Sequence, residues 1–309
     1  MVLRLFFKRM DAAQAGLCAP GRHLGRGLAQ ALLTCSLGVA GAVLVASAHA
    51  APQQQSEPAA PATMDEPERQ DLSFKLPLGQ SIEVDNPYGT VYLRFGGYEH
   101  QLDIRATVQQ PKGAARFAFA PGPNGQRFVV TATLPDGTSL AKGQRIDLIL
   151  YVPEAHPIKV TTVAGNIESR GIKADVDFKS QSGNIIARGT EGMTLAETDD
   201  GRIQIMLRDG PPAGSYQRLA TRTGEIIAGV SDALNADIEL STSGVFATEY
   251  SLTVEHLDKE EPNKRAFAKV GQPKAGKEGA QIALDSLRGN IKLWRRTVFV
   301  DASDETDGD

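Results

Sequence analysis

The chain has 309 residues, with 33 basic and 37 acidic side chains and a formal net charge of −4 at pH 7. Aromatic residues make up only 6% of the chain, whereas glycine occurs 31 times. This composition is typical of strands and turns rather than helices. The acidic balance argues against a nucleic-acid partner, because phosphate binding depends on clustered positive charge.

Residues 1–50 predict an export signal peptide. Basic residues precede an apolar run from Ala31 to Ala46, and Ala48-His49-Ala50 places small residues where a signal peptidase reads them. We expect cleavage after Ala50. An uncleaved membrane anchor is the alternative, and it would be the chain's contact with the membrane. Both readings predict a domain in the periplasm or cell envelope.

Both cysteines, Cys18 and Cys35, lie in this segment, so the mature chain is expected to have no disulfide. Its stability must then come from burial and backbone pairing. Cleavage would also remove five basic residues and one acid, which leaves 28 basic and 36 acidic residues and a net charge of −8.

The rest of the chain divides by pattern. Residues 51–70 are rich in Pro, Gln and Ala and predict a disordered linker, and residues 301–309 predict an acidic disordered tail. Residues 71–156 alternate apolar and polar side chains, which predicts an N-terminal antiparallel β region. No amphipathic helix of normal length fits this stretch.

An internal repeat occupies residues 157–300. In each copy a short polar run meets a glycine and then an aliphatic strand, as in SQSGNIIA, and NPYGTVYL is an earlier relative. The repeat glycines are Gly89, Gly165, Gly183, Gly201, Gly224, Gly244 and Gly289.

We expect an all-β fold in which the repeats stack as a β-solenoid. An antiparallel β-sandwich is the alternative, because a Gly-Asn pair is also a hairpin signal. The repeat glycines are expected to supply positive-φ corners. The isoleucine two places after most of them should face a shared interior, at Ile167, Ile185, Ile203, Ile226 and Ile291.

Several segments resemble a family of bacterial putative adhesins, a domain family of unknown function related to head domains proposed for autotransporter adhesins. The resemblance covers roughly residues 80 to 296. It rests on Val84-Asp85-Asn86-Pro87-Tyr88-Gly89-Thr90-Val91, on Ile149-Leu150-Tyr151-Val152-Pro153 leading into Val160-Thr161-Thr162, and on the Ser-Gly-Asn-Ile repeats. The resemblance implies an extracytoplasmic β-solenoid-like domain without known catalytic residues.

The sequence holds only partial matches to catalytic and metal-binding patterns. His100, His156 and His256 lack a second ligand at metal spacing. Ser139-Leu140-Ala141-Lys142 matches Ser-x-x-Lys, but it follows a turn rather than opening a helix. Asp199, Asp200 and Glu225 flank repeat glycines and are interpreted as solvated turn residues. We therefore expect no catalytic residue, cofactor or structural metal.

The sequence favours a non-enzymatic exported cell-envelope protein whose β-repeat surface binds an envelope component, either protein or glycan. One alternative is a regulatory partner of an envelope-stress system. The other is a glycan-cleaving β-helix enzyme that works with carboxylates at the repeat edge.

Overall fold

The computed structural model describes residues 63–98, 100–207, 214–231, 234–271 and 279–295. All of them belong to one compact unit, Ala59–Asp309. The predicted signal peptide, most of the predicted linker and the acidic tail lie outside the described residues. Within the described ranges every regular element is a strand, and no helix is long and apolar enough to cross a membrane.

The strands in chain order are β1 (Glu68–Lys75), β2 (Ser81–Asn86), β3 (Val91–Phe95), β4 (Gln101–Gln109), β5 (Ala118–Asn124), β6 (Arg127–Thr133), β7 (Arg145–Val152), β8 (Ile158–Thr162), β9 (Ile167–Arg170), β10 (Val176–Ser180), β11 (Ile185–Thr190), β12 (Thr194–Thr198), β13 (Ile203–Leu207), β14 (Tyr216–Thr221), β15 (Ile226–Val230), β16 (Ala236–Thr242), β17 (Phe246–Thr248), β18 (Thr253–His256), β19 (Lys264–Val270), β20 (Ala280–Ser286) and β21 (Ile291–Arg295). β1 begins within the segment predicted as linker.

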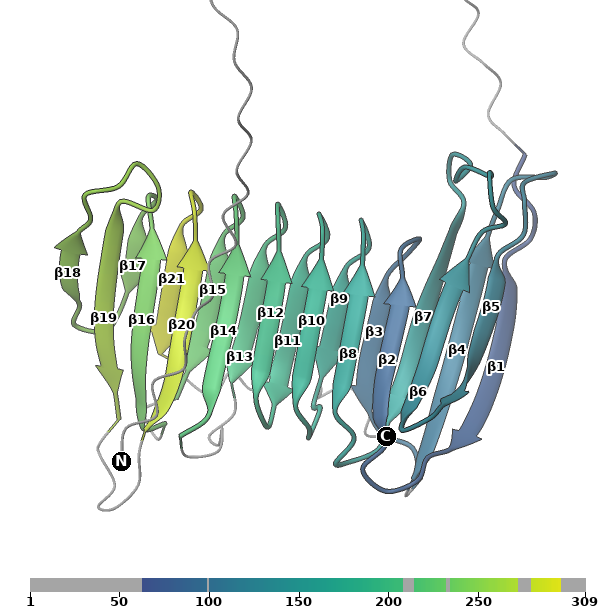
Figure 1. The fold of residues 1–309 in the computed structure, drawn as a ribbon, viewed down its shortest axis with the longest axis horizontal. Coiled ribbons are helices and arrows are strands. Elements are labelled where there is room, and N and C mark those ends of the chain that lie inside the picture. The colour runs from purple at the N-terminus through teal and green to yellow at the C-terminus, as the bar shows by residue number, and fades with distance from the viewer. Residues whose placement is uncertain (1–62, 99, 208–213, 232–233, 272–278, 296–309) are drawn as a thin grey trace, which may run out of the picture. The chain divides into compact units, whose positions relative to one another are not determined.

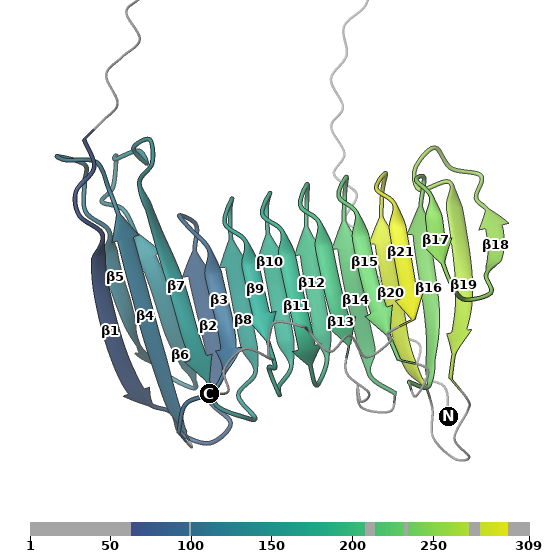
Figure 2. The ribbon, with the colours of Figure 1, turned by 180° about the vertical axis from the view of Figure 1, so that it is seen from behind.

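The strands form two large mixed sheets (Figures 1 and 2). The ten-stranded sheet has the order β1-β4-β7-β3-β9-β11-β13-β15-β21-β17, and the eleven-stranded sheet has the order β18-β19-β16-β20-β14-β12-β10-β8-β2-β6-β5. The all-β prediction is confirmed. The two-sheet arrangement is also compatible with a sandwich-like description.

Each repeat contributes one strand to each sheet. A repeat unit is defined here as a strand of the eleven-stranded sheet, its glycine turn, and the next strand of the ten-stranded sheet, as in β10, Gly183 and β11. Equivalent strands of neighbouring units pair in parallel, with Ile185 opposite both Ile167 and Ile203. This parallel pairing places equivalent residues side by side and differs from the pairing within a hairpin.

The earlier relative of the repeat, NPYGTVYL, also forms a repeat unit. β2 pairs in parallel with β8, and β3 pairs in parallel with β9. The segment 81–95 is therefore a repeat unit inside the region expected to be antiparallel. Antiparallel pairing in that region joins β1 to β4, β4 to β7, and β5 to β6.

The order of units in space departs from their order in the chain. β21 lies between β15 and β17, and β20 lies between β14 and β16. The unit β16–β17 is therefore terminal, although β20–β21 follows it in the sequence. The antiparallel hairpin β18–β19 continues the eleven-stranded sheet beyond β16.

One apolar core joins the inward faces of both sheets. The isoleucines that the repeat predicts as interior are fully buried, since Ile167, Ile185, Ile203, Ile226 and Ile291 each have 0% exposure. Neighbouring members of this row are register partners. Burying such a side chain contributes roughly 1.5–3 kcal/mol relative to exposing it, so the row is a continuous source of stability.

Candidate functional site

The repeat glycines stack at one edge of the molecule, and close contact between units is what requires glycine there. A Cβ on Gly201 would lie 2.0 Å from the carbonyl oxygen of Gly183. A Cβ on Gly224 would lie 1.8 Å from that of Gly201. These separations are far below any real contact. Gly165, Gly183 and Gly289 meet the preceding glycine in the same way, at 1.7–1.9 Å.

The expected reason for these glycines was wrong. The described glycines with positive φ include Gly171 and Gly189, but none of the seven repeat glycines. Gly171 and Gly189 occupy the second corner of their repeats, with φ of 69° and 67°. The positive-φ requirement therefore applies at that corner, whereas the repeat glycines are selected by the carbonyl of the neighbouring unit.

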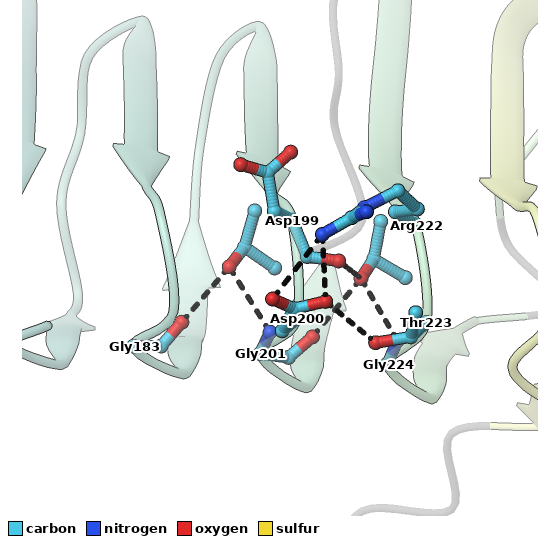
Figure 3. Close-up of polar contacts among 9 residues, drawn as sticks. Gly183, Asp199, Asp200, Gly201, Arg222, Thr223 and Gly224 are labelled. Carbon is cyan, nitrogen blue, oxygen red and sulfur yellow. Dashed lines mark hydrogen bonds and ion pairs between the residues drawn. The ribbon is translucent and has the colours of Figure 1, made fainter. Parts of the chain in front are cut away.

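In several units, a hydroxyl three residues before the glycine ties the unit to its neighbour. The Thr198 hydroxyl donates to the Gly183 carbonyl at 3.1 Å and accepts from the Gly201 N–H at 3.2 Å. Thr221 repeats this with Gly201 and Gly224, at 3.1 Å for both bonds. Ser286 does the same with Gly224 and Gly289 (Figure 3 shows the Gly183 to Gly224 portion). These hydroxyls satisfy buried backbone groups of the turn.

Asp200 and Glu225, two of the three acidic residues considered as glycan-cleaving groups, are engaged by basic residues. Asp200 accepts hydrogen bonds from the Arg222 guanidinium at 3.1 Å and from the Thr223 hydroxyl at 3.0 Å (Figure 3). Glu225 is paired with Arg202 at 3.4 Å and with Lys292 at 2.6 Å. The backbone carbonyl of Asp199 accepts from the N–H groups of Arg222 and Thr223. The acids thus join consecutive turns.

The three histidines are not brought together as one site. His156 is fully buried, and its Nδ1 lies 2.7 Å from the Gln80 carbonyl oxygen. Its ring centroid is 6.2 Å from that of His100, while His256 is exposed on β18. In the described ranges, no group of three or more His, Cys, Asp or Glu side chains could hold a metal ion. Ser139 and Lys142 are exposed in the β6–β7 connection.

The outer face of the eleven-stranded sheet is a lattice of opposite charges. Its ion pairs join neighbouring strands, as Glu83 does with Arg127 at 2.5 Å and with Lys159 at 3.6 Å. Lys179–Glu197, Arg218–Asp285, Arg265–Glu239 and Lys269–Asp237 continue this pattern. Shallow depressions along this face include some of these paired groups in their lining.

The outer face of the ten-stranded sheet has a different composition. Parallel register aligns one residue from each of seven strands, β7, β3, β9, β11, β13, β15 and β21, in the row Tyr151, Arg94, Arg170, Arg188, Met206, Gly229 and Trp294. The three cations are consecutive, and we call Arg94, Arg170 and Arg188 the arginine row. Arg170 and Arg188 are exposed. Within the described residues, neither side chain has a hydrogen-bond or ion-pair partner.

The arginine row and the hydroxyls were missed by the sequence interpretation, although both left a signal. Ser or Thr stands three residues before five of the repeat glycines, in Thr-Val-Ala-Gly, Ser-Gln-Ser-Gly, Thr-Asp-Asp-Gly, Thr-Arg-Thr-Gly and Ser-Leu-Arg-Gly. Arginine stands five residues after Gly89, Gly165 and Gly183. Aligning the repeats on their glycines would have exposed both columns.

Among known proteins, the matches are to solved structures, and their likeness to this chain is one of fold. No family model matches the chain, and no curated protein matches its sequence. A putative cell adhesion protein from Clostridium sporogenes is 10% identical, with a TM-score of 0.48, 75% of this chain covered and 100% of the other. Putative adhesins from Bacteroides fragilis and Parabacteroides merdae are also 10% identical, with TM-scores of 0.38 and 0.23, 74% of this chain covered and 97% of each of theirs.

Proposed function

We propose that this chain is an exported, non-enzymatic cell-envelope protein in which stacked β repeats present a binding surface to an envelope component. In this proposal the repeat units are the turns of a β-solenoid. The observation that carries it is the parallel register, which converts one outward position of the repeat into a row of side chains across the ten-stranded sheet. Such a row can bind an extended partner at several equivalent points.

The ion pairs of Asp200 and Glu225 support a binding protein over a glycan-cleaving enzyme that would use these two carboxylates. A glycosidase needs two carboxyl groups facing one glycosidic bond, one of them free to donate a proton. Here Asp200 is held by Arg222 and Thr223, and Glu225 by Arg202 and Lys292. Both acids have structural partners in the adjacent units, which accounts for their presence without catalysis.

The test is retention on envelope material, with released sugar measured in the same experiment. The exported chain, purified from its own cells, is mixed with isolated envelope fractions. Saturable retention without sugar release is the expected result. A double variant, Asp200→Asn with Glu225→Gln, should be retained equally well. Sugar release that disappears in this variant would contradict the proposal, and so would a failure to be retained.

Export is a separate part of the proposal, because it rests on residues 1–50 alone. Accessibility to an added protease in intact and in outer-membrane-permeabilised cells tests it. We expect protection in intact cells and digestion after permeabilisation, together with a mature N-terminus at residue 51. Recovery in the cytoplasm with Met1 or Val2 at the N-terminus would contradict it.

A further inference from the structure

The arginine row stands out because nothing within the described residues neutralises it. Arg94, Arg170 and Arg188 are direct register partners on β3, β9 and β11. Neighbouring strands lie about 4.8 Å apart, and like charges directly opposite one another destabilise a sheet. On the eleven-stranded sheet, the register partners Lys179 and Glu197 carry opposite charges and form an ion pair, and so do Lys159 and Glu83. Among the described residues, charges on the outer face of the eleven-stranded sheet are therefore paired, whereas the outer face of the ten-stranded sheet carries an unpaired cationic row.

The row also lies on a sheet face rather than in a loop. Arg94 has its guanidinium 5.8 Å from the Tyr92 ring centroid, while Arg170 and Arg188 are exposed on the same face. The nearest outward acid in the neighbouring row is Glu168, the register partner of Tyr92 and Ile186. Glu168 makes no ion pair with the row. The row is thus a short positive stripe on a chain of negative net charge.

We infer that the arginine row binds a linear acidic polysaccharide, a polymer with one carboxylate per sugar, laid across strands β3, β9 and β11. This inference rests on the proposed binding function and names the class of its partner. The planar guanidinium matches a carboxylate through two parallel hydrogen bonds, which a lysine cannot form. The carboxylates of such a polymer recur along its chain, as the guanidinium groups recur across strands that lie about 4.8 Å apart.

Charge decides against nucleic acid as the occupant. Nucleic-acid binding needs many phosphate contacts from a broad basic surface. Here the stripe has three cations, and the chain around it has a net charge of −4. Beyond Arg188 the row continues with Met206, Gly229 and Trp294, where Trp294 is 38% exposed.

The experiment measures binding of oligogalacturonate of defined length to the exported protein by calorimetry. The matched ligand control is the same oligomer with its carboxylates methyl-esterified. We expect binding of the acid form, weakened by added salt, and no binding of the ester. Equal binding of both forms, or no binding of the acid form, overturns the inference. Tighter binding of a single-stranded oligonucleotide also overturns it, in favour of nucleic acid.

Variants locate the site. The double variant Arg170→Gln with Arg188→Gln should weaken binding about tenfold or more, since charge-assisted bidentate bonds are strong. Glu168→Gln should strengthen binding about twofold, because it removes a neighbouring negative charge. The matched control, Lys179→Gln with Arg218→Gln, removes two positive charges from the opposite face and should change binding less than about twofold. An equal loss in the control would refute the assigned face.

The two proposals can fail separately. The Arg170→Gln with Arg188→Gln variant is also applied to envelope fractions, after matching its circular dichroism spectrum and unfolding midpoint to those of the parent chain. If the parent is retained on envelope but ignores oligogalacturonate, the polysaccharide inference fails and the binding function stands. If the parent is not retained at all, both fail.

Discussion

The strongest structural prediction concerns Gly201, in the middle of the stacked repeat glycines, which we call the glycine column. Replacing it with alanine puts a Cβ 2.0 Å from the Gly183 carbonyl oxygen and 2.9 Å from the Thr198 hydroxyl. Ordinary van der Waals contact with that carbonyl needs about 1.4 Å more, and the obstructing atom is backbone fixed by parallel pairing on both sides. Overpacking of this kind costs about 1–3 kcal/mol.

The hydroxyls of Thr198, Thr221 and Ser286, which we call the hydroxyl ladder, make the loss of stability larger. Opening the gap between the two turns would lengthen the bond from the Thr198 hydroxyl to the Gly183 carbonyl, now 3.1 Å. A buried carbonyl left without its partner costs about 1–3 kcal/mol. Together these effects predict that Gly201→Ala lowers the free energy of unfolding by about 2–6 kcal/mol, measured by urea denaturation.

Two glycines serve as matched controls for this measurement. A Cβ on Gly122 would meet no atom within 4 Å, and its φ is not positive, so Gly122→Ala should change the free energy of unfolding by less than about 0.5 kcal/mol. Gly137 has φ of +77° in open space, so Gly137→Asn should be tolerated, since asparagine accepts that conformation. Gly201→Asn should be at least as harmful as Gly201→Ala. If Gly201→Ala cost no more than Gly122→Ala, close stacking would be refuted.

Three further predictions concern the core, the ladder and the candidate surface. Ile203→Ala should lower the free energy of unfolding by about 2–5 kcal/mol, whereas Ile186→Ala, on the outer face of β11, should cost much less in the same denaturation series. Thr198→Val should cost about 1–3 kcal/mol, because its hydroxyl serves both Gly183 and Gly201, and Thr198→Ser should restore most of that loss. Burial raises the pKa of Tyr92, and the charge of Glu168 raises it further; Glu168→Gln should therefore lower the tyrosine pKa seen by NMR titration, and an unchanged value would place Glu168 away from Tyr92.

The repeat was readable from the sequence, but its physical reason was not. Glycine at 165, 183 and 201 is compatible with a positive-φ corner and also with a neighbouring backbone that leaves no room for a side chain. Both requirements select glycine, so the sequence does not distinguish them. Only the neighbouring carbonyl distinguishes them, and that group belongs to another unit. The buried isoleucines were predictable because period-two alternation fixes which face a residue occupies once the strand is known.

The spatial position of the last units was not predicted, because consecutive repeats are ordinarily neighbours in space. The sequence nevertheless holds a clue at Gly244. The hydroxyl that accepts from the Gly244 N–H belongs to Thr242, which stands two residues before the glycine instead of three. A Cβ on Gly244 would lie 2.6 Å from the Gly289 carbonyl, a looser fit than elsewhere in the column. Terminal repeats are commonly atypical, and this irregular unit is the terminal one.

The division of labour within the repeat explains why a binding surface can be placed on the sheet face. Gly201, Thr198 and Ile203 act through backbone contact, turn hydrogen bonds and burial, so each is constrained by the adjacent units. Outward positions such as Arg188 meet no such constraint, and a change there alters the surface without altering the stack. Repulsion within the arginine row destabilises the sheet, but the fold tolerates it because its stability comes from the interior. Charged residues at these outward positions can therefore vary to suit a ligand without loss of stability.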